Sequence, residues 1–237
     1  MIYMITIRKS NERGHANHGW LDSYHSFSFA EYYDPAFMGY STLRVINEDV
    51  IAGGTGFGMH AHRDMEIVTY ILSGQLRHQD SMGNTSTISA GDVQRMTAGS
   101  GVRHSEFNAS TTEAVHLLQI WILPAELHLL PSYEEKHFSE SEKKNQWRLI
   151  VSPDGTDGSI KIHQNAHLYA SIMDEGMTLD MPLLHGHQNY LQLASGTILL
   201  NDIELNAGDA VMVENESKVM ITASANTELL WFDLAKA

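Results

Sequence analysis

A short pattern that occurs twice constrains the fold of this chain more than any other feature of the sequence. Each copy contains a His-X-His, a Ser-Gly and a Gly-Asp element, in the same order and at close spacings. The copies read His60-Ala61-His62, Ser73-Gly74-Gln75-Leu76 and Ala90-Gly91-Asp92-Val93, then His185-Gly186-His187, Ser195-Gly196-Thr197-Ile198 and Ala207-Gly208-Asp209-Ala210. Such a repeat indicates one supersecondary unit used twice. We therefore expect two similar domains, residues 1–130 and residues 131–237.

The local pattern within each half is that of short strands. Runs rich in β-forming residues, such as residues 66–72 and 211–213, are bounded by Gly, Ser and Asp, and this spacing favours a sandwich or barrel. Residues 1–7 also resemble a strand. Helical periodicity is scarce, and its best candidate is the charged stretch 131–145, where residues 132–135 resemble a helix start. The sequence thus predicts an all-β fold of two antiparallel barrels joined by a linker with a short helix.

Charge and cysteine content narrow the possible functions. The formal net charge of −14 at pH 7 works against binding to nucleic acid or anionic lipid, because both require clustered Lys and Arg. The sequence has no cysteine, so a metal would be held by imidazole and oxygen. It shows no apolar run near the ~18 to 20 residues of a membrane span and no basic signal-peptide region. We therefore expect a cytoplasmic protein that contacts neither nucleic acid directly nor membrane.

Two residue pairs in the first half have the spacing of metal ligands on strands. Residues two apart in a strand point to the same face, so His60 and His62 share one face, and His104 and Glu106 share another. Two such pairs on neighbouring strands can bring three imidazoles and a carboxylate to one point. These ligands suit Fe, Ni, Cu, Mn, Co or Zn rather than Ca or Mg. Glu66 shares the face of His62 if the strand runs unbroken, so parity alone leaves the choice of carboxylate open.

The second half carries only part of this pattern. His185 and His187 match His60 and His62, but counting from the shared Gly-Asp element places Ile221 and Ala223 at the positions of the other pair. These side chains cannot bind a metal, so we expect the second half to be a scaffold without one. A further histidine cluster near the N-terminus is expected to make capping or aromatic-edge contacts rather than chemistry. It comprises His15, His18 and His25.

Longer segments of the first half resemble a known family. Residues 58–66 with Gly74 resemble the first cupin motif, and residues 91–104 resemble the second. More narrowly, residues 27–35, 43–49, 78–84 and 91–106 resemble the pirin family, as do the segments 130–133 and 150–155 further on. The likeness is strong from about residue 20 to residue 130 and only general beyond residue 155. It implies a bicupin fold with metal in the first barrel, ligated by His60, His62, His104 and Glu106, with iron favoured.

The resemblance also implies roles for the two glutamates and a reaction. Glu106 takes the fourth ligand position, and Glu66 becomes a buried acceptor that orients a ligand imidazole. Pirin-like proteins resemble quercetin dioxygenases, which implies cleavage of a flavonol heterocycle with O2. The substrate hydroxyl would lose its proton to a nearby carboxylate, with Glu106 as catalytic base and Glu66 as the alternative.

Two other functions are open to such a chain. One is a metal-dependent binding or regulatory module whose metal shapes a surface for a protein partner, as the family resemblance also implies. The other is an isomerase or epimerase acting on a sugar phosphate. That activity would require basic residues around the metal cavity, and the nearby candidates are Arg63, Arg95 and Arg103.

Overall fold

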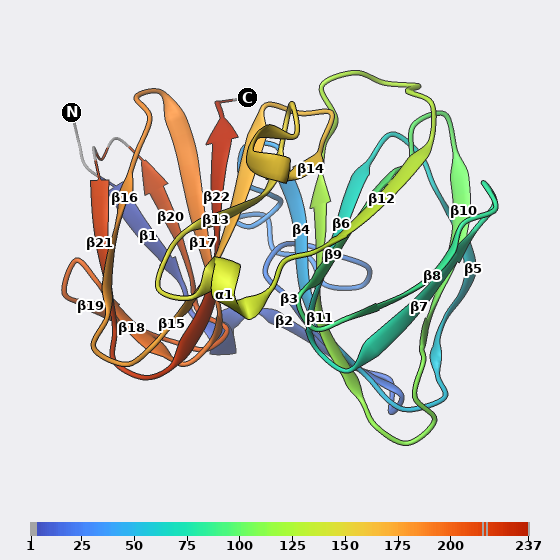
Figure 1. Cartoon of the computed structure of the whole chain (residues 1–237), viewed down its shortest axis with the longest axis horizontal. Coiled ribbons are helices and arrows are strands. Elements are labelled where there is room, and N and C mark those ends of the chain that lie inside the picture. The colour runs from blue at the N-terminus through green and yellow to red at the C-terminus, as the bar shows by residue number, and fades with distance from the viewer. Residues whose placement is uncertain (1–3, 215, 217, 237) are drawn as a thin grey trace.

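Two β-rich halves lie side by side in the computed structural model, which describes residues 4–214, 216 and 218–236 (Figure 1). Each half consists of a seven-stranded sheet facing a four-stranded sheet. In the N-terminal half the larger sheet runs in the order β12 (Ser132–His137), β9 (Asp92–Thr97), β6 (Glu66–Ser73), β11 (Val115–Ile122), β4 (Leu43–Ile51), β3 (Leu21–His25) and β2 (Gly14–Asn17). The smaller sheet runs β5 (Gly56–His62), β10 (Val102–Asn108), β7 (Gln75–Asp80) and β8 (Thr85–Ser89).

The C-terminal half repeats this arrangement. Its larger sheet runs β1 (Met4–Arg8), β20 (Ala210–Glu214), β17 (His187–Ser195), β22 (Thr227–Ala235), β15 (Ala166–Met173), β13 (Arg148–Ser152) and β14 (Ile160–Lys161). Its smaller sheet runs β16 (Thr178–Pro182), β21 (Lys218–Ala223), β18 (Thr197–Leu200) and β19 (Ile203–Asn206). The all-β, two-cupin architecture predicted from the sequence is confirmed, although the two sheets of each half form an open jelly roll rather than a closed barrel.

The repeated Gly-Asp element forms the same turn in both halves. Gly91 and Gly208 adopt left-handed conformations, with φ of 90° and 84°, which glycine tolerates without steric cost. Asp92 Oδ2 accepts a hydrogen bond from the backbone N–H of Ser89 at 2.7 Å, and Asp209 Oδ2 accepts one from Asn206 at 3.1 Å. The repeat therefore marks a structural turn and not a catalytic group.

The two halves exchange edge strands. β1 pairs with β20 in the C-terminal half, whereas β12 pairs with β9 in the N-terminal half, and each occupies the same edge of its sheet. In Figure 1 the blue strand β1 accordingly lies among the orange and red strands. The division into residues 1–130 and 131–237 stays a prediction. The predicted first strand is present from residue 4, and residues 1–3 lie outside the described part of the chain.

The expected helix is shorter than its charge pattern indicates. Residues 132–135, predicted as a helix start, belong instead to strand β12, because they pair with the otherwise open edge of β9. The α-helix α1 covers only Glu140–Lys143, and Ser139 and Glu142 form its capping box. Short 3-10 turns lie at Ser10–Glu12 and Thr156–Gly158. None of the helices in the described part of the chain is long and apolar enough to cross a bilayer.

A shared apolar layer joins the halves. It lies between the two seven-stranded sheets, where Val68 and Ile120 from one half pack in the same cluster as Phe232 and Leu230 from the other. Polar contacts reinforce it, since the buried Lys143 ammonium donates to the Tyr70 hydroxyl at 2.9 Å. Tyr70 in turn donates to Glu228 on β22. Because the larger sheets are buried against each other, any site must open between the two sheets of one half.

Candidate metal centre

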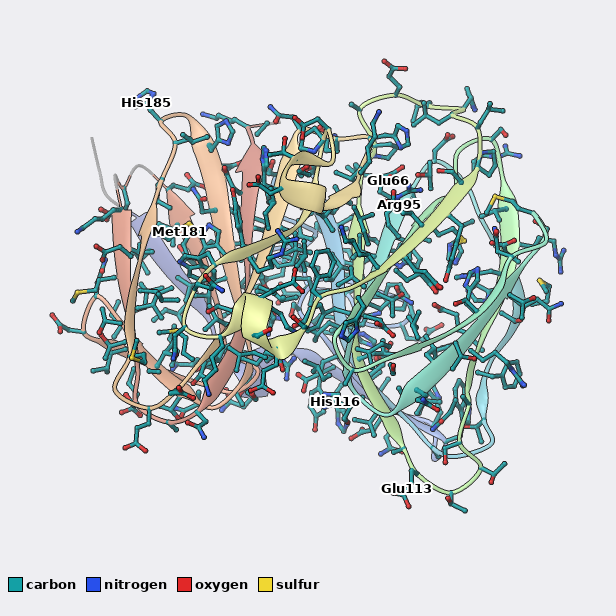
Figure 2. All side chains as sticks on the ribbon, viewed as in Figure 1. Glu66, Arg95, Glu113, His116, Met181 and His185 are labelled. Carbon is teal, nitrogen blue, oxygen red and sulfur yellow. The ribbon has the colours of Figure 1, made fainter. Side chains whose placement is uncertain are left out.

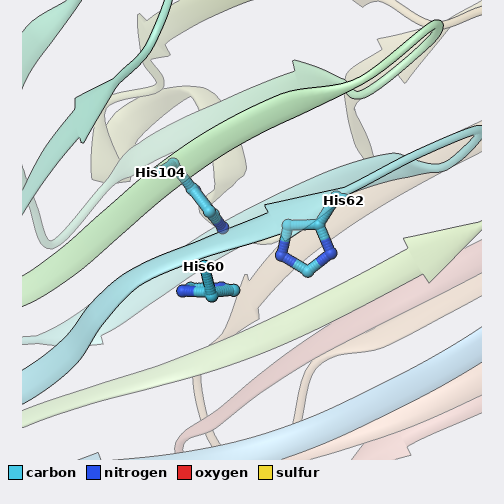
Figure 3. Close-up of side chains that lie close together, drawn as sticks. All are labelled: His60, His62 and His104. Carbon is cyan, nitrogen blue, oxygen red and sulfur yellow. The ribbon is translucent and has the colours of Figure 1, made fainter.

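Three histidines converge between β5 and β10. The strands are antiparallel neighbours, with His104 directly opposite His60. The ring centroids lie 4.4 Å apart for His60 and His104, and 4.8 Å for each of the other two pairs. One ligand atom from each of His60, His62 and His104 can lie within 4.8 Å of the others, and Figure 3 shows the three rings facing a common space. The structure thus brings together the three predicted imidazoles.

Glu106 lies beside them, on the inner face of β10. The pairing with β5 shifts register between His104 and Glu106, so Glu106 lies opposite Phe57 instead of Gly58. The Gln119 side-chain amide donates to Glu106 Oε2 at 3.0 Å, whereas Oε1 has no hydrogen-bond partner. Glu106 belongs with His104 to a second ligand group, whose ligand atoms also lie within 4.8 Å of one another. Its third member, His78 on β7, was not singled out from the sequence.

The unsatisfied atoms of these side chains fit a metal. Both ring nitrogens of His104 and Glu106 Oε1 are buried and without hydrogen-bond partners, which costs free energy unless a ligand satisfies them. The His60 ring is oriented by a 2.7 Å hydrogen bond from Nδ1 to the Gly58 carbonyl, which leaves Nε2 for a metal. A set of imidazoles and one carboxylate suits a first-row transition metal.

Electrostatics keep two of the imidazoles ready to bind a metal. Burial, together with the neighbouring rings of His104 and His60, lowers the pKa of His62 to about 4. Burial, with His60 and His78 nearby, lowers the pKa of His104 to about 3. Both rings are therefore neutral at pH 7, the form in which imidazole binds a metal.

Glu66 lies on the face of the larger sheet that points away from the three histidines. A turn at Asp64, with φ of 48°, separates β5 from β6, so the assumed unbroken strand does not exist. Glu66 instead accepts a hydrogen bond from Thr97 at 3.1 Å and lies 3.5 Å from the His163 ring of the C-terminal half. Figure 2 shows it beside Arg95, which also contacts Thr97. The prediction that Glu66 orients a ligand imidazole is therefore wrong.

A cavity of about 730 Å³ opens onto the centre. Its lining includes His60, His62 and Glu106, together with aromatic side chains and a polar wall on β3 and β4. The histidine cluster predicted to make aromatic-edge contacts also lines it: His15 stacks on Tyr24 at 4.3 Å, and His25 lies 5.3 Å from Phe29. His15 and His25 thus contact aromatic rings, but the His15 contact is stacked rather than edge-on, and the place of the cluster at the cavity could not be read from the sequence.

The C-terminal half has no counterpart to this centre among the residues the structure describes. His187 pairs with Asp233 at 2.7 Å, and His185 is exposed at the far end of that half (Figure 2). Strand β21, the equivalent of β10, turns Val219, Ile221 and Ala223 inward, and all three are buried. The two ligand groups found in the described residues both lie in the N-terminal half.

Comparison with known proteins agrees with this geometry. The model of the Pirin family matches residues 6–122, and that of the quercetinase C-terminal cupin domain matches residues 149–234. Quercetin 2,3-dioxygenase of Escherichia coli K12 is 49% identical over 233 residues, which cover 98% of this chain and 99% of the relative. The chain belongs to the pirin family.

Solved structures of this pirin-family group include a metal complex. Bacterial pirin YhhW from Escherichia coli in complex with nickel(II) superposes with a TM-score of 0.94 at 46% identity, covering 99% of this chain and 100% of that one. A pirin-like protein of Caulobacter vibrioides is 39% identical, over 98% of this chain and all of its own length. Membership of the pirin family implies a bound metal, and the unsatisfied atoms of His104 and Glu106 fit one.

Proposed function

We propose that this pirin is a metal-dependent quercetin 2,3-dioxygenase, which cleaves the heterocycle of a flavonol with O2, and that His60, His62, His104 and Glu106 hold its metal. The observation that carries the proposal is the group of imidazole and carboxylate side chains, with unsatisfied atoms on His104 and Glu106, beside a large, partly aromatic cavity lined by His60, His62 and Glu106. Iron is the proposed resident metal, with Ni, Cu, Mn, Co and Zn as the metals to compare. A cytoplasmic location is part of the same proposal.

The chain's own residues account for binding and proton transfer. A bound transition metal supplies Lewis-acid activation of a chelating hydroxyl and electron transfer between substrate and O2. Glu106, whose unpartnered Oε1 would face the metal, is also the proposed base that accepts the proton of that hydroxyl. The Gln119 amide holds the other carboxylate oxygen and so fixes the orientation of the base.

The cavity has two chemically different surfaces that suit a polyphenol. Trp20, Phe29, Phe57 and Trp121 offer faces and edges for flat aromatic rings. The lining also includes Ser23, His25, Asn47 and Asp49, which present hydrogen-bonding groups from β3 and β4.

Asp49 on this polar surface can act either as a hydrogen-bond donor or as an acceptor. Burial raises the pKa of Asp49 to about 7, the Ser23 hydrogen bond lowers it and the nearby Glu106 charge raises it. Near neutral pH it can therefore donate to, or accept from, a substrate hydroxyl.

The lining argues against a sugar-phosphate isomerase. The residues that line the cavity in the described part of the chain include no Lys or Arg. Arg95 is buried elsewhere, bonded to Thr97 and Ser132. Arg63 and Arg103 border a surface hollow that shares His62 with the cavity, but they do not line the cavity itself. A regulatory module acting through a protein partner would require no such interior space, so the cavity favours the enzyme.

The test is aerobic incubation of Fe-, Ni-, Cu-, Mn-, Co- and Zn-loaded protein with quercetin, following flavonol absorbance and dissolved O2 together. We expect metal-dependent loss of both. Absence of turnover across the panel would refute the dioxygenase and leave the regulatory module. His104→Ala tests the site separately, because full activity and full metal content in that variant would refute the ligand assignment while leaving the reaction standing.

A further inference from the structure

His78 is held rigidly behind the metal centre. Its side chain is fully buried, its ring stacks on Tyr133 with centroids 4.7 Å apart, and its Nε2 lies 3.0 Å from Asp80 Oδ2. Asp80 is itself fixed, since it accepts hydrogen bonds from the backbone of Met82 at 2.9 Å and from the Asn84 side chain at 2.8 Å. A carboxylate so placed makes Nε2 the protonated nitrogen of a neutral ring. Nδ1 is then a bare acceptor.

The His78 ring lies beside two of the proposed ligands. His78 lies directly opposite Glu106 across the β7–β10 pair, and Asp80 lies opposite His104. Ligand atoms of His78, His104 and Glu106 lie within 4.8 Å of one another, and the ring centroids of His78 and His104 are 5.4 Å apart. The Nδ1 atom of His78 and both nitrogens of His104 are buried without hydrogen-bond partners.

Once a metal is bound to His104, the remaining N–H of its ring can donate a hydrogen bond to His78 Nδ1. A histidine that ligates through one nitrogen carries a proton on the other, and that N–H needs an acceptor to fix the ring and its tautomer. His104 is almost completely buried, so bulk water does not supply one. In this ligand group, Nδ1 of His78 is available as an acceptor, because the Asp80 carboxylate already fixes the ring proton on Nε2.

We propose that His78, locked by Asp80, is the positioning residue of the metal centre and accepts the N–H of ligand His104. This role rests on the metal site of the proposed function, but not on the flavonol reaction. The fold itself does not require a polar residue there, because the equivalent position in the C-terminal half is Leu200, paired with Ile221. Both of those residues are buried and apolar.

Two substitutions separate positioning from packing. His78→Asn keeps an acceptor near the position of Nδ1 but loses the contact with Asp80, whereas His78→Gln keeps a polar group near Nε2 and loses the acceptor toward His104. Tyr133→Phe keeps the stacked ring and is the control. For each protein we would measure Ni²⁺ affinity by chelator competition, the visible absorption of the Co²⁺ form, and the unfolding temperature of the metal-free form.

We expect His78→Gln to bind Ni²⁺ about 10- to 100-fold more weakly and to change the Co²⁺ bands, as loss of an outer hydrogen-bond partner does. His78→Asn should bind more tightly than His78→Gln, and Tyr133→Phe should match the wild type. Wild-type affinity and spectrum in His78→Gln would overturn the role. If His78→Asn and His78→Gln weakened Ni²⁺ binding equally and lowered the unfolding temperature to match, His78 would act only through packing. That result would also overturn the positioning role. A wild-type chain that binds no Ni²⁺ or Co²⁺ would overturn the metal site itself.

Discussion

The two halves share a strand order but fill their interiors differently. One row of residues, in register across the larger sheet, is polar in the N-terminal half and apolar in the C-terminal half. The polar row is Gln94, Thr69, Gln119, Asn47 and His25. The matching apolar row is Val211, Leu191, Trp231, Tyr169 and Leu149.

The polar row is a hydrogen-bonded support for the site. Thr69 donates to Gln119 at 3.1 Å, Gln119 donates to Glu106, and His25 lies 2.8 Å from Asn47. Trp231, opposite in character, is fully buried in a single apolar cluster. The N-terminal half has two smaller apolar clusters instead. The N-terminal half thus carries polar residues that support the site at positions where the C-terminal half has packed apolar side chains.

The largest expected effect is on the apolar row. Trp231→Ala should lower the free energy of unfolding by about 3–5 kcal/mol, because it removes a fully buried aromatic ring and leaves a cavity. Gln119→Ala at the matching position should cost about 1–2 kcal/mol. Urea unfolding of the metal-free proteins measures both. Equal losses of unfolding free energy in the two variants would contradict the contrast between the apolar interior of the C-terminal half and the site-bearing interior of the N-terminal half.

Metal should stabilise one half selectively. At a free concentration 100 times its Kd, a metal should add about 2.7 kcal/mol to the unfolding free energy. Hydrogen exchange should slow at β5 and β10 more than at β16 and β21. His104→Ala should abolish the effect, whereas His187→Ala in the C-terminal half should keep it. Equal protection of β16 and β21 would contradict a site confined to the first half.

Acid should weaken the metal-free protein through His104. Its folded pKa is about 3, below the usual 6.5, so between these values the unfolded chain binds a proton that the folded protein does not. Stability should therefore fall as pH drops below 6.5, by at most about 2 kcal/mol from this group at pH 5. Urea unfolding at pH 8 and pH 5 should show a smaller loss in His104→Gln. The exposed His185→Gln serves as control and should behave like wild type.

The smallest expected effect comes from the hydrogen bond that orients Glu106. Gln119→Leu, which makes the row locally resemble the C-terminal half, should weaken Ni²⁺ binding about tenfold, or about 1.4 kcal/mol. Chelator competition measures this change. Leu191→Met, a conservative change within the apolar row of the C-terminal half, serves as the control, and Ni²⁺ affinity should not change in it. Unaltered Ni²⁺ affinity in Gln119→Leu would show that the polar row does not support metal binding.

Strand alternation made most of the constellation predictable. It placed His60 with His62 and His104 with Glu106, and these four side chains lie close together. His78 shares the inner face of β7 with Leu76 and Asp80, and all three are buried. No spacing rule singled it out, because a lone histidine carries no ligand pattern of its own.

Where sequence reasoning failed, a turn or a distant partner intervened. Parity could not be carried from His62 to Glu66 because Asp64 breaks the strand. Residues 132–135 have a helix-like charge pattern, but the open edge of β9 draws them into a sheet. His185 and His187 match the first motif in letters, yet they follow β16 instead of lying within it. Local patterns do not encode such long-range pairings.

The exchange of edge strands also sets an order of events during synthesis. Residues of β1 leave the ribosome early, but their partners in β20, such as Glu214 opposite Met4, are made much later. The metal-binding sheets can assemble while β1 waits as an unpaired strand, and such a strand invites pairing with other chains. β1 therefore cannot take its place in the C-terminal sheet until β20 has been synthesised.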